Sequence, residues 1–314
     1  MKKWLSFKYI LGLFFLLLSF TESCKEKNIE STISVDDKIN STLEKKEIAP
    51  EFKKYWYAGK AEITSYTIQQ ARYGELRDGT AVLIYVTEPF LGEKQVKADA
   101  NNTTNIPVLK LNSTKNYITG IYPYSIMTSS FYPVYDNSHA LKLSFSAQEW
   151  CGQVYSQLNN KKTFEITSHS YFENEADQNF SIQKNILENE IWNKIRINPD
   201  NLPVGNLKII PSLEFIRLRH KELKDYNATA KLELKNDVLK IYSIDYPELE
   251  RKISITFTTN FPHTIENWSE TFKSGFGSNA KSMTTTAQKN KSIITAYWQQ
   301  NKNSDLFLRD SLGL

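Results

Sequence analysis

Residues 228–235 read ATAKLELK, and this alternation of apolar and polar side chains decides the fold class. In an extended chain the apolar residues would point to one side and the polar residues to the other. The same period of two recurs in residues 141–146 and 252–257. Strands with one apolar and one polar face are typical of antiparallel sheets. The sequence therefore predicts a mainly β protein.

Two short polar pairs indicate where such strands turn. Asp78-Gly79 lies between two strand-like runs and predicts a hairpin turn. Asn236-Asp237 plays a similar part between residues 228–235 and 238–244. No strand–helix–strand rhythm is visible, so a doubly wound parallel sheet is not expected.

One segment has the periodicity of an amphipathic helix. Its apolar positions form a single stripe: Ile182, Ile186, Leu187, Ile191 and Ile195. This predicts one main helix over about 181–197, with Ser181 or Asn179 as its cap. Pro199 would end it, because a residue before proline avoids helical geometry. A second, weaker helix is expected near residues 289–300.

Residues 51–314 are expected to form a single mainly-β domain, since about 260 residues can bury one large core. The predicted architecture is a large antiparallel, strongly curved sheet or barrel with the helix packed on it or closing an end. Curvature is one way for a sheet of many strands to protect its edges. A pair of packed β domains is the alternative.

The first residues have the parts of a secretory signal. Lysines precede a charge-free apolar run from Tyr9 to Phe20, which is too short to span a bilayer core of about 20 helical residues. Cys24 follows, as in bacterial lipoprotein signals. We predict a signal peptide at 1–23 and lipidation of Cys24. The alternative is a soluble secreted protein with a free Cys24, because Thr21-x-Ser23 also fits ordinary signal peptidase.

Residues 24–50 are polar and charge-rich, which predicts a flexible tether after the lipidated cysteine. Removing residues 1–23 removes three lysines and one glutamate, so the net charge falls from +4 to +2. This balance produces no field that favours nucleic acid as a partner. The expected partner is a membrane, bound through the N-terminal lipid.

The chain has two cysteines, too few for a disulfide framework. If Cys24 is acylated, Cys151 has no partner, and we expect it to be a small buried apolar residue. A Cys24–Cys151 bridge and a reactive thiol are the alternatives.

The densest polar cluster, residues 168–177, would join a strand at 163–171 to the predicted helix. His169 with Glu173 or Asp177 could form an acid–base or metal set, because histidine titrates near neutrality and carboxylates can orient it. A zinc site needs about three protein ligands, and no His-Glu-x-x-His occurs. The competing interpretation is a loop whose acidic residues favour the helix N-terminus. No metal is predicted.

Two other motifs are rejected. Residues 275–282, GFGSNAKS, approach a P-loop, but Ala280 stands where the second glycine belongs and β-branched residues follow the lysine. No Gly-x-Ser-x-Gly nucleophile motif is present. We therefore expect no cofactor and no serine hydrolase site.

Aromatic residues are concentrated between residues 117 and 135 and spread through the rest of the domain. Aromatic rings fill cores and also line apolar or sugar-binding pockets. Tyr122, Tyr124 and Trp150 are the candidate ligand-binding residues, for an apolar or glycan ligand. The competing interpretation is that these rings only pack the core and the edges of the sheet.

Several stretches together carry a family resemblance. They are YWYAGKAEI at 55–63, ARYGE at 71–75, VLIYVTE at 82–88, IYPYS at 121–125, QEWCG at 148–152 and SHSYF at 168–172. The chain resembles an uncharacterised family of Bacteroidetes-type envelope lipoproteins, some of whose members are labelled "septum formation inhibitor Maf". Maf pyrophosphatases have a Ser-x-Ser-Pro-Arg-Arg-type motif near the N-terminus, which residues 1–60 do not contain. The resemblance implies a location in the cell envelope and attachment through a lipid anchor. It supplies no catalytic residues.

These patterns favour a non-enzymatic envelope lipoprotein, expected at the outer membrane, whose β domain binds a ligand or an envelope protein. One alternative is an envelope hydrolase that uses His169 with nearby carboxylates. Another is an assembly or scaffold lipoprotein without a small ligand.

Overall fold

The structure is a computed structural model that describes residues 47–314, which belong to one compact unit. The predicted signal peptide, Cys24 and most of the predicted tether lie outside the described residues.

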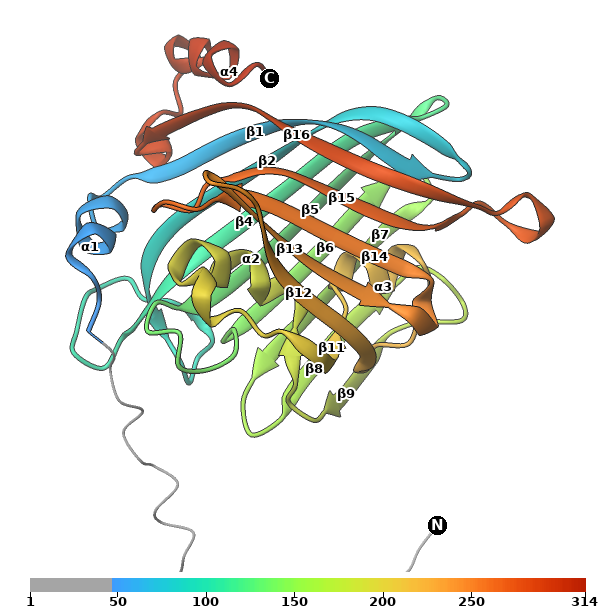
Figure 1. The fold of residues 1–314 in the computed structure, drawn as a ribbon, viewed down its shortest axis with the longest axis horizontal. Coiled ribbons are helices and arrows are strands. Elements are labelled where there is room, and N and C mark those ends of the chain that lie inside the picture. Colours follow the sequence, from blue (N-terminus) through green and yellow to red (C-terminus); the bar gives the residue numbers. More distant parts are fainter. Residues whose placement is uncertain (1–46) are drawn as a thin grey trace, which may run out of the picture. The chain divides into compact units, whose positions relative to one another are not determined.

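The domain is built on one sheet of 16 strands (Figure 1). In chain order the strands are β1 Ala61–Arg72, β2 Glu75–Leu91, β3 Val96–Lys97, β4 Ile106–Thr119, β5 Tyr122–Pro133, β6 Lys142–Glu149, β7 Gly152–Asn160, β8 Phe164–Ser170, β9 Gln178–Ile182, β10 Ile186–Leu187, β11 Gly205–Ile210, β12 Tyr226–Asn236, β13 Leu239–Tyr246, β14 Arg251–Thr258, β15 Ile265–Ser274 and β16 Lys281–Thr295. The predicted fold class, a large antiparallel and strongly curved sheet, is confirmed.

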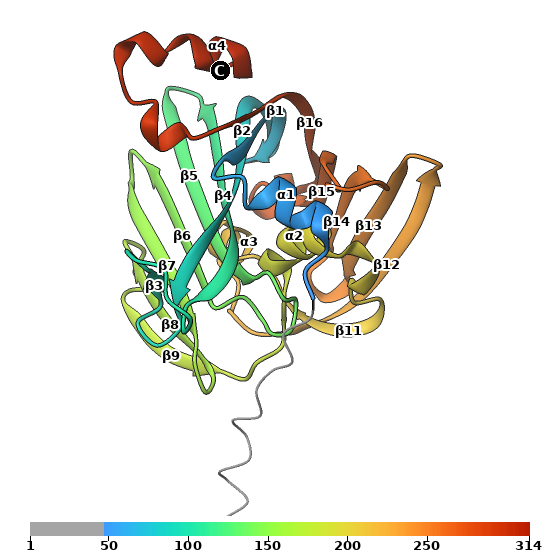
Figure 2. The same cartoon turned by 90° about the vertical axis from the view of Figure 1, so that its left-hand side faces the viewer.

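The strand order runs β10-β11-β12-β13-β14-β15-β16-β1-β2-β4-β5-β6-β7-β8-β9, and β3 pairs with β2. The first strand therefore lies beside the last one in the middle of the sheet, with Ala61 opposite Thr295. Every ladder is antiparallel except the short one between β10 and β11. The two flanks curve toward each other and enclose a concave face (Figure 2).

Two helices fill this concavity: α2 Glu188–Ile197 and α3 Leu213–Leu218. The main core consists of the inward side chains of both flanks together with the helices, for example Phe145, Tyr242, Phe257 and Ile191. Helix α1 Pro50–Trp56 adds Phe52 and Trp56 to this core.

A second, smaller core lies on the convex side of the sheet. Helix α4 Phe307–Leu312 places Leu312 against Ala61, Ile63 and Val86. The hydroxyl of Ser65 donates to the carbonyl oxygen of Leu312 at 2.5 Å. The chain after β16 therefore folds back onto the outside of β1.

The hairpin predicted at Asp78-Gly79 is wrong, because both residues lie inside β2. The turn between β1 and β2 is Tyr73-Gly74, whose φ angles of 55° and 79° are both positive. Two residues with positive φ form the hairpin turn that matches strand twist. The prediction at Asn236-Asp237 is confirmed, since β12 ends at Asn236 and β13 follows at Leu239.

The predicted helix over 181–197 exists, but it begins later than expected. Ser181 and Asn179, proposed as caps, belong to β9, and the helix starts at Glu188. Ile182, the first residue of the apolar stripe, pairs with Phe164 of β8, and the next two, Ile186 and Leu187, form β10. A short apolar run fits a strand or a helix equally well, and here tertiary pairing decides between them.

The weaker helix expected near 289–300 is wrong. Strand β16 continues to Thr295 and is followed by a single 3₁₀ turn, Tyr297–Gln299. Between β15 on one side and β1 on the other, residues 281–295 are held as a strand.

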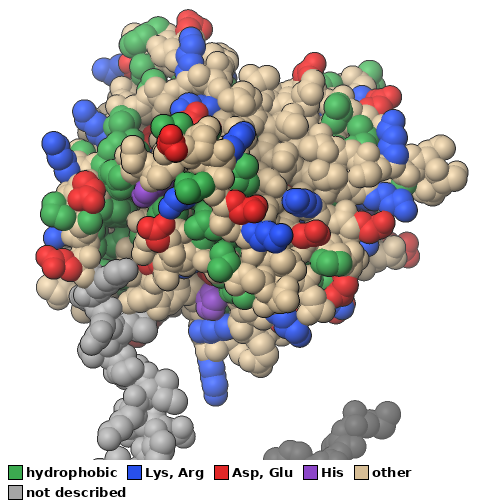
Figure 3. All heavy atoms as spheres, viewed as in Figure 1, with side chains coloured by type: hydrophobic (Ala, Val, Ile, Leu, Met, Phe, Trp, Pro, Cys, Tyr) green, Lys and Arg blue, Asp and Glu red, His purple; other side chains and the backbone are tan. Residues whose placement is uncertain are grey.

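Positive and negative side chains are interspersed over the face shown in Figure 3. Within residues 47–314, no helix has the length and apolar character needed to cross a bilayer.

Candidate functional site

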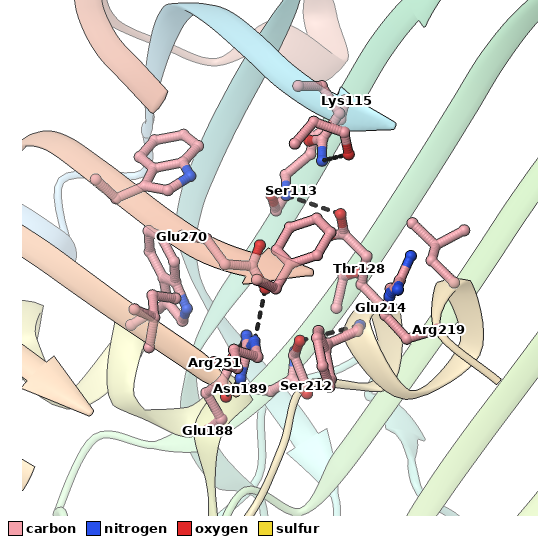
Figure 4. Close-up of a pocket in the computed structure, with 18 of the residues that line it drawn as sticks. Ser113, Lys115, Thr128, Glu188, Asn189, Ser212, Glu214, Arg219, Arg251 and Glu270 are labelled. Carbon is pink, nitrogen blue, oxygen red and sulfur yellow. Dashed lines mark hydrogen bonds and ion pairs between the residues drawn. The ribbon is translucent and has the colours of Figure 1, made fainter. Parts of the chain in front are cut away.

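An interior cavity of about 70 Å³ lies between the concave face and helices α2 and α3 (Figure 4). Strands β1, β4 and β5 form one wall, and β14 and β15 form the opposite wall. Part of the lining is aromatic, from Trp192, Phe215, Trp268 and Phe272. The rest is polar or charged, as the labelled residues in Figure 4 show. The chemistry of the cavity depends on which of these polar groups are already satisfied.

Arg251 is the most completely paired charge of the cavity. Its guanidinium contacts the carboxylate of Glu188 at 2.5 and 2.7 Å and that of Glu270 at 2.6 Å. The side chains of Arg251 and Glu188 are each 1% exposed. The hydroxyl of Tyr246 also donates to Glu188, at 2.8 Å. This network ties the start of α2 to strands β13, β14 and β15, so its role is to hold the helix.

Lys115 of β4 makes a second pair across the cavity. Its ammonium lies 2.8 Å from the carboxylate of Glu214 on α3. Burial lowers the pKa of Lys115, but Glu214 and Glu270 together raise it above its ordinary value. Lys115 therefore stays charged and fixes α3 over the cavity.

Two buried polar side chains of the lining are not satisfied. The Oε1 atom of Gln70 and the Oγ atom of Ser130 have no hydrogen-bond partner among the described residues. These residues are 3% and 2% exposed. A buried polar group without a partner costs about 1–3 kcal/mol, and native proteins normally provide water or a ligand for it. The cavity therefore favours a polar occupant.

Arg72, at the end of β1, is the third unsatisfied group. Its Nη1 donates to the carbonyl oxygen of Leu218 at 2.8 Å. Its Nη2 donates to the hydroxyls of Tyr73 and Tyr124, each at 3.1 Å. The Nε–H has no partner, and no carboxylate lies within 4 Å of Arg72 in the part of the chain described. All of its hydrogen-bond partners are thus neutral.

A larger groove of about 880 Å³ opens where β8 and β9 face α3. Ile166, Leu213 and Ile216 give it a buried apolar floor. Polar residues of the β8–β9 loop and of residues 220–224 line its rim. The groove lies on the side of the sheet where β9 has no further strand beside it in residues 47–314.

The groove and the cavity have no lining residue in common, but each shares residues with a third space. A small void of about 30 Å³ lies next to both. The void and the cavity share Arg72 and Leu218, and the void and the groove share Phe172, Arg217 and His220. The end of α3 thus forms a common wall, and Arg72 lies between the inner and outer spaces.

The structure brings together the three aromatic residues predicted from the sequence. Tyr122 lies 6.0 Å from Tyr124 and 6.3 Å from Trp150, measured between ring centroids. Tyr124 is buried and lines the small void. Trp150 is 68% exposed, and neither it nor Tyr122 lines a described pocket. Of the three, Tyr124 is the one that reaches the candidate site.

His169, Glu173 and Asp177 are only partly brought together. His169 Nδ1 lies 3.1 Å from a carboxylate oxygen of Asp177, and both side chains are exposed. Glu173 lines the groove instead. His169 points to the outer face of the sheet, because its neighbours in β8 alternate sides and Ser168 lines the groove. No cluster of three potential metal ligands occurs in residues 47–314.

The cluster at 168–177 joins β8 to β9, and not to a helix as expected. Glu175 from this loop binds Arg217 at the end of α3 and accepts from Ser170 at 2.9 Å. The loop is therefore tied to the wall that separates the groove from the void.

Cys151 is exposed and free, so the prediction of a buried residue is wrong. It occupies the tip of the β6–β7 hairpin, where its N–H donates to Glu149 at 2.7 Å. The P-loop-like stretch is a hairpin between β15 and β16, and Lys281 begins a strand. Its rejection as a phosphate loop agrees with this geometry.

Sequence reasoning missed the residues that define the cavity. Gln70, Arg72 and Ser130 belong to strands that do not alternate strictly between buried and exposed positions there, and no catalytic or binding motif includes them. Glu188 and Arg251 come together from positions 63 residues apart. A usable signal was the presence of an ionisable residue at an inward position of a strand.

No protein-family model matches the chain, and no curated protein matches it. Among solved structures it is similar to a β-barrel-like protein of the domain of unknown function DUF1849 from Brucella abortus, with 7% identity and a TM-score of 0.44. That match covers 75% of this chain and 97% of the other.

A porin-like protein from Bacteroides uniformis matches with 10% identity and a TM-score of 0.23, over 74% of this chain and 96% of the other. Both TM-scores lie below 0.5, so these likenesses add nothing to the fold described above.

Proposed function

We propose that this protein is a lipid-anchored protein of the cell envelope whose β domain binds an amphiphilic small molecule and does not transform it. The observation that carries the proposal is the groove of about 880 Å³ beside the open edge of the sheet. Sites for small molecules commonly have volumes of about 300–1,000 Å³.

The lining supports an amphiphile over a purely polar or purely apolar ligand. The floor formed by Ile166, Leu213 and Ile216 offers apolar contact. The neighbouring cavity offers unsatisfied polar groups on Gln70 and Ser130. A molecule with an apolar part in the groove and a polar part directed inward would satisfy both.

The sequence supports the envelope location. A lysine-rich start, a short apolar run and Cys24 favour export and lipidation, and residues 24–50 suit a tether. The resemblance to envelope lipoproteins favours the same cellular location, at the outer membrane. In this proposal the tether holds the binding domain away from the membrane surface.

The hydrolase alternative has less support. His169 and Asp177 are exposed on the outer face of the sheet and line none of the described pockets. A general base must lie within hydrogen-bond reach of the bound substrate.

The test is to purify the full chain from membranes in a mild detergent, extract bound molecules with solvent, and weigh the protein by native mass spectrometry. We expect one amphiphile per chain. Ile182→Glu, which puts a charge into the groove, should abolish this co-purification. Ile121→Glu is the matched control, because Ile121 is 82% exposed and lines no described pocket. A folded wild-type protein that carries nothing, and binds no amphiphile added back, would exclude the proposal.

A further inference from the structure

Arg72 is a half-buried cation with no carboxylate within 4 Å among the described residues. All three of its hydrogen-bond acceptors are neutral: one carbonyl oxygen and two tyrosine hydroxyls. The remaining donor, Nε–H, has no partner. Removing a charge from water is costly unless an opposite charge pairs with it, which is why buried charges in proteins are normally paired.

The neighbourhood increases the positive charge instead of balancing it. Arg219 lines the same cavity, and no carboxylate lies within 4 Å of it among the described residues. Burial and then the charge of Arg72 lower the pKa of Arg219, and a smaller contribution from Glu270 raises it. Arg217 also lies near Arg72, and its own carboxylate partner, Glu175, is already shared with His220.

The other cavity charges cannot supply the missing anion. Glu188 and Glu270 are held by Arg251, and Glu214 is held by Lys115. Three acidic residues therefore face four basic ones in the lining. The excess positive charge lies on the side of Arg72 and Arg219.

We propose that Arg72 and Arg219 form an oxyanion site that binds the acid group of the ligand, a carboxylate or a phosphate. Guanidinium groups bind such oxyanions through planar, charge-assisted hydrogen bonds. The unpaired Nε–H of Arg72 is one donor for this purpose. The Oγ–H of Ser130 can donate to the acid group, whereas Gln70 Oε1 only accepts and needs a donor on the ligand, such as a hydroxyl group. This assignment rests on the proposed binding function and specifies its ligand class.

The cavity sets the size of the group that reaches the site. A bound water needs roughly 10–15 Å³ of such space, so the cavity of about 70 Å³ holds roughly five to seven water-sized groups. An inorganic phosphate or a short carboxylate fits this limit. The apolar remainder of a longer molecule would extend past the end of α3 toward the groove.

The experiment compares three small probes on the delipidated full chain: butyrate, inorganic phosphate and 1-butanol. Butyrate and 1-butanol share an apolar chain and differ in the acid group. Isothermal titration calorimetry and the melting temperature measure binding. We expect at least one anion to bind and raise the melting temperature by about 5–10 °C at 100 times its Kd, and 1-butanol to have no effect.

Arg72→Gln should weaken anion binding at least about tenfold. Arg219→Gln should weaken it as well, and it serves as the second variant if Arg72→Gln does not fold. Arg309→Gln is the matched control, because Arg309 is exposed on α4 and should leave the affinity unchanged.

Each outcome decides a different point. Tighter binding of butyrate assigns the site to an organic acid, and tighter binding of phosphate assigns it to a phosphate group. Equal binding of butyrate and 1-butanol, unaffected by Arg72→Gln, would overturn the oxyanion site while leaving amphiphile binding intact. Failure of both anions to bind would also overturn it, and the solvent extraction described above then decides the binding function separately.

Discussion

At the scale of single residues, the domain contains two kinds of arginine in or beside its core: fully buried ones paired with carboxylates, and a half-buried one with neutral partners. Arg251 and Arg196 are each 1% exposed in the ion pair and hold carboxylates in two-pronged contacts, with Glu188 and Glu62 respectively. Arg72 has only neutral partners. The first kind fastens helix α2 to the sheet, and the second kind is available for an external anion.

Glu188→Gln should strongly destabilise the domain. The substitution keeps the shape of the side chain but leaves the buried charge of Arg251 with Glu270 alone. Breaking a buried ion pair in this way costs about 3–5 kcal/mol. Urea unfolding at neutral pH measures the change in the free energy of unfolding.

Glu165→Gln is the control for Glu188→Gln. Glu165 pairs with Lys161 at 3.0 Å, but both side chains are about half exposed. Exposed pairs contribute about 0–1 kcal/mol. Equal losses in the two variants would contradict the structural role assigned to the buried pair.

The same pair makes the stability of the domain depend on pH, and Glu188→Gln also checks this. Burial raises the pKa of Glu188, but Arg251, together with hydrogen bonds from Tyr246 and Ser212, lowers it overall. Arg196 has the same net effect on Glu62. The unfolded chain, with glutamate pKa values near about 4.3, therefore takes up protons first as the pH falls. The contribution of these pairs is complete above about pH 4.3 and is lost below it. The melting temperature should fall more steeply there in the wild type than in Glu188→Gln.

These residue-scale features could not be predicted from the sequence. The helix pattern identified Ile191 and Ile195 as inward residues, and both are buried. Glu188, Asn193 and Arg196 lie outside that apolar stripe, yet they are buried as well. Their burial depends on partners such as Glu62 and Arg251, which are distant in the sequence. The periodicity of residues along one helix does not show which distant residues will pair with it.

At the scale of elements, the alternation of side chains predicted the strands well because one face of the sheet is covered by a core. Residue pairs typical of turns predicted the positions of the turns less reliably. Asp78-Gly79 was expected to form a turn, but Gly79 lies in β2 opposite Tyr117 of β4. A side chain at position 79 would meet the backbone of Asn116 and the Cβ of Tyr117, the latter at 2.8 Å. This glycine permits close approach of two strands and does not form a turn.

Gly79→Ala should therefore destabilise the domain by about 1–3 kcal/mol, because the strands must move apart. Gly92→Ala is the control. An added Cβ there would meet only the end of the Ile106 side chain, at 2.9 Å, which can move aside. Thermal unfolding of both variants measures the difference. A loss for Gly92→Ala as large as that for Gly79→Ala would refute this account.

At the scale of the whole molecule, the architecture was predictable as a curved antiparallel sheet, but its strand order was not. Local alternation says which segments are strands, and it does not say that β1 pairs with β16. The position of the groove follows from that order, since the groove lies beside β9 at one end of the path. Local sequence patterns therefore could not predict where the candidate site lies.

The proposed anchor is also tested at this scale. Cys24→Ser should move the protein from the membrane to the soluble fraction, because the acyl chains can no longer be attached. Fractionation of cells, followed by detection of the protein in each fraction, measures this. Cys151→Ser is the matched control and should leave the distribution unchanged. Retention of the Cys24→Ser variant in the membrane would refute lipid anchoring through this residue.

The pairing of β1 with β16 has a consequence for how the chain acquires its structure. These two strands lie at the centre of the sheet, yet 228 residues separate Thr64 from Ser292, whose hydroxyls meet at 2.9 Å. Contacts of such long sequence separation form slowly, because closing the intervening loop costs entropy before any contact compensates for it. The two flanks cannot be joined until β16 has been synthesised. A nascent chain that cannot join its two flanks before residues 281–295 are made suits the proposed export, because it can cross a membrane unfolded and fold on the far side.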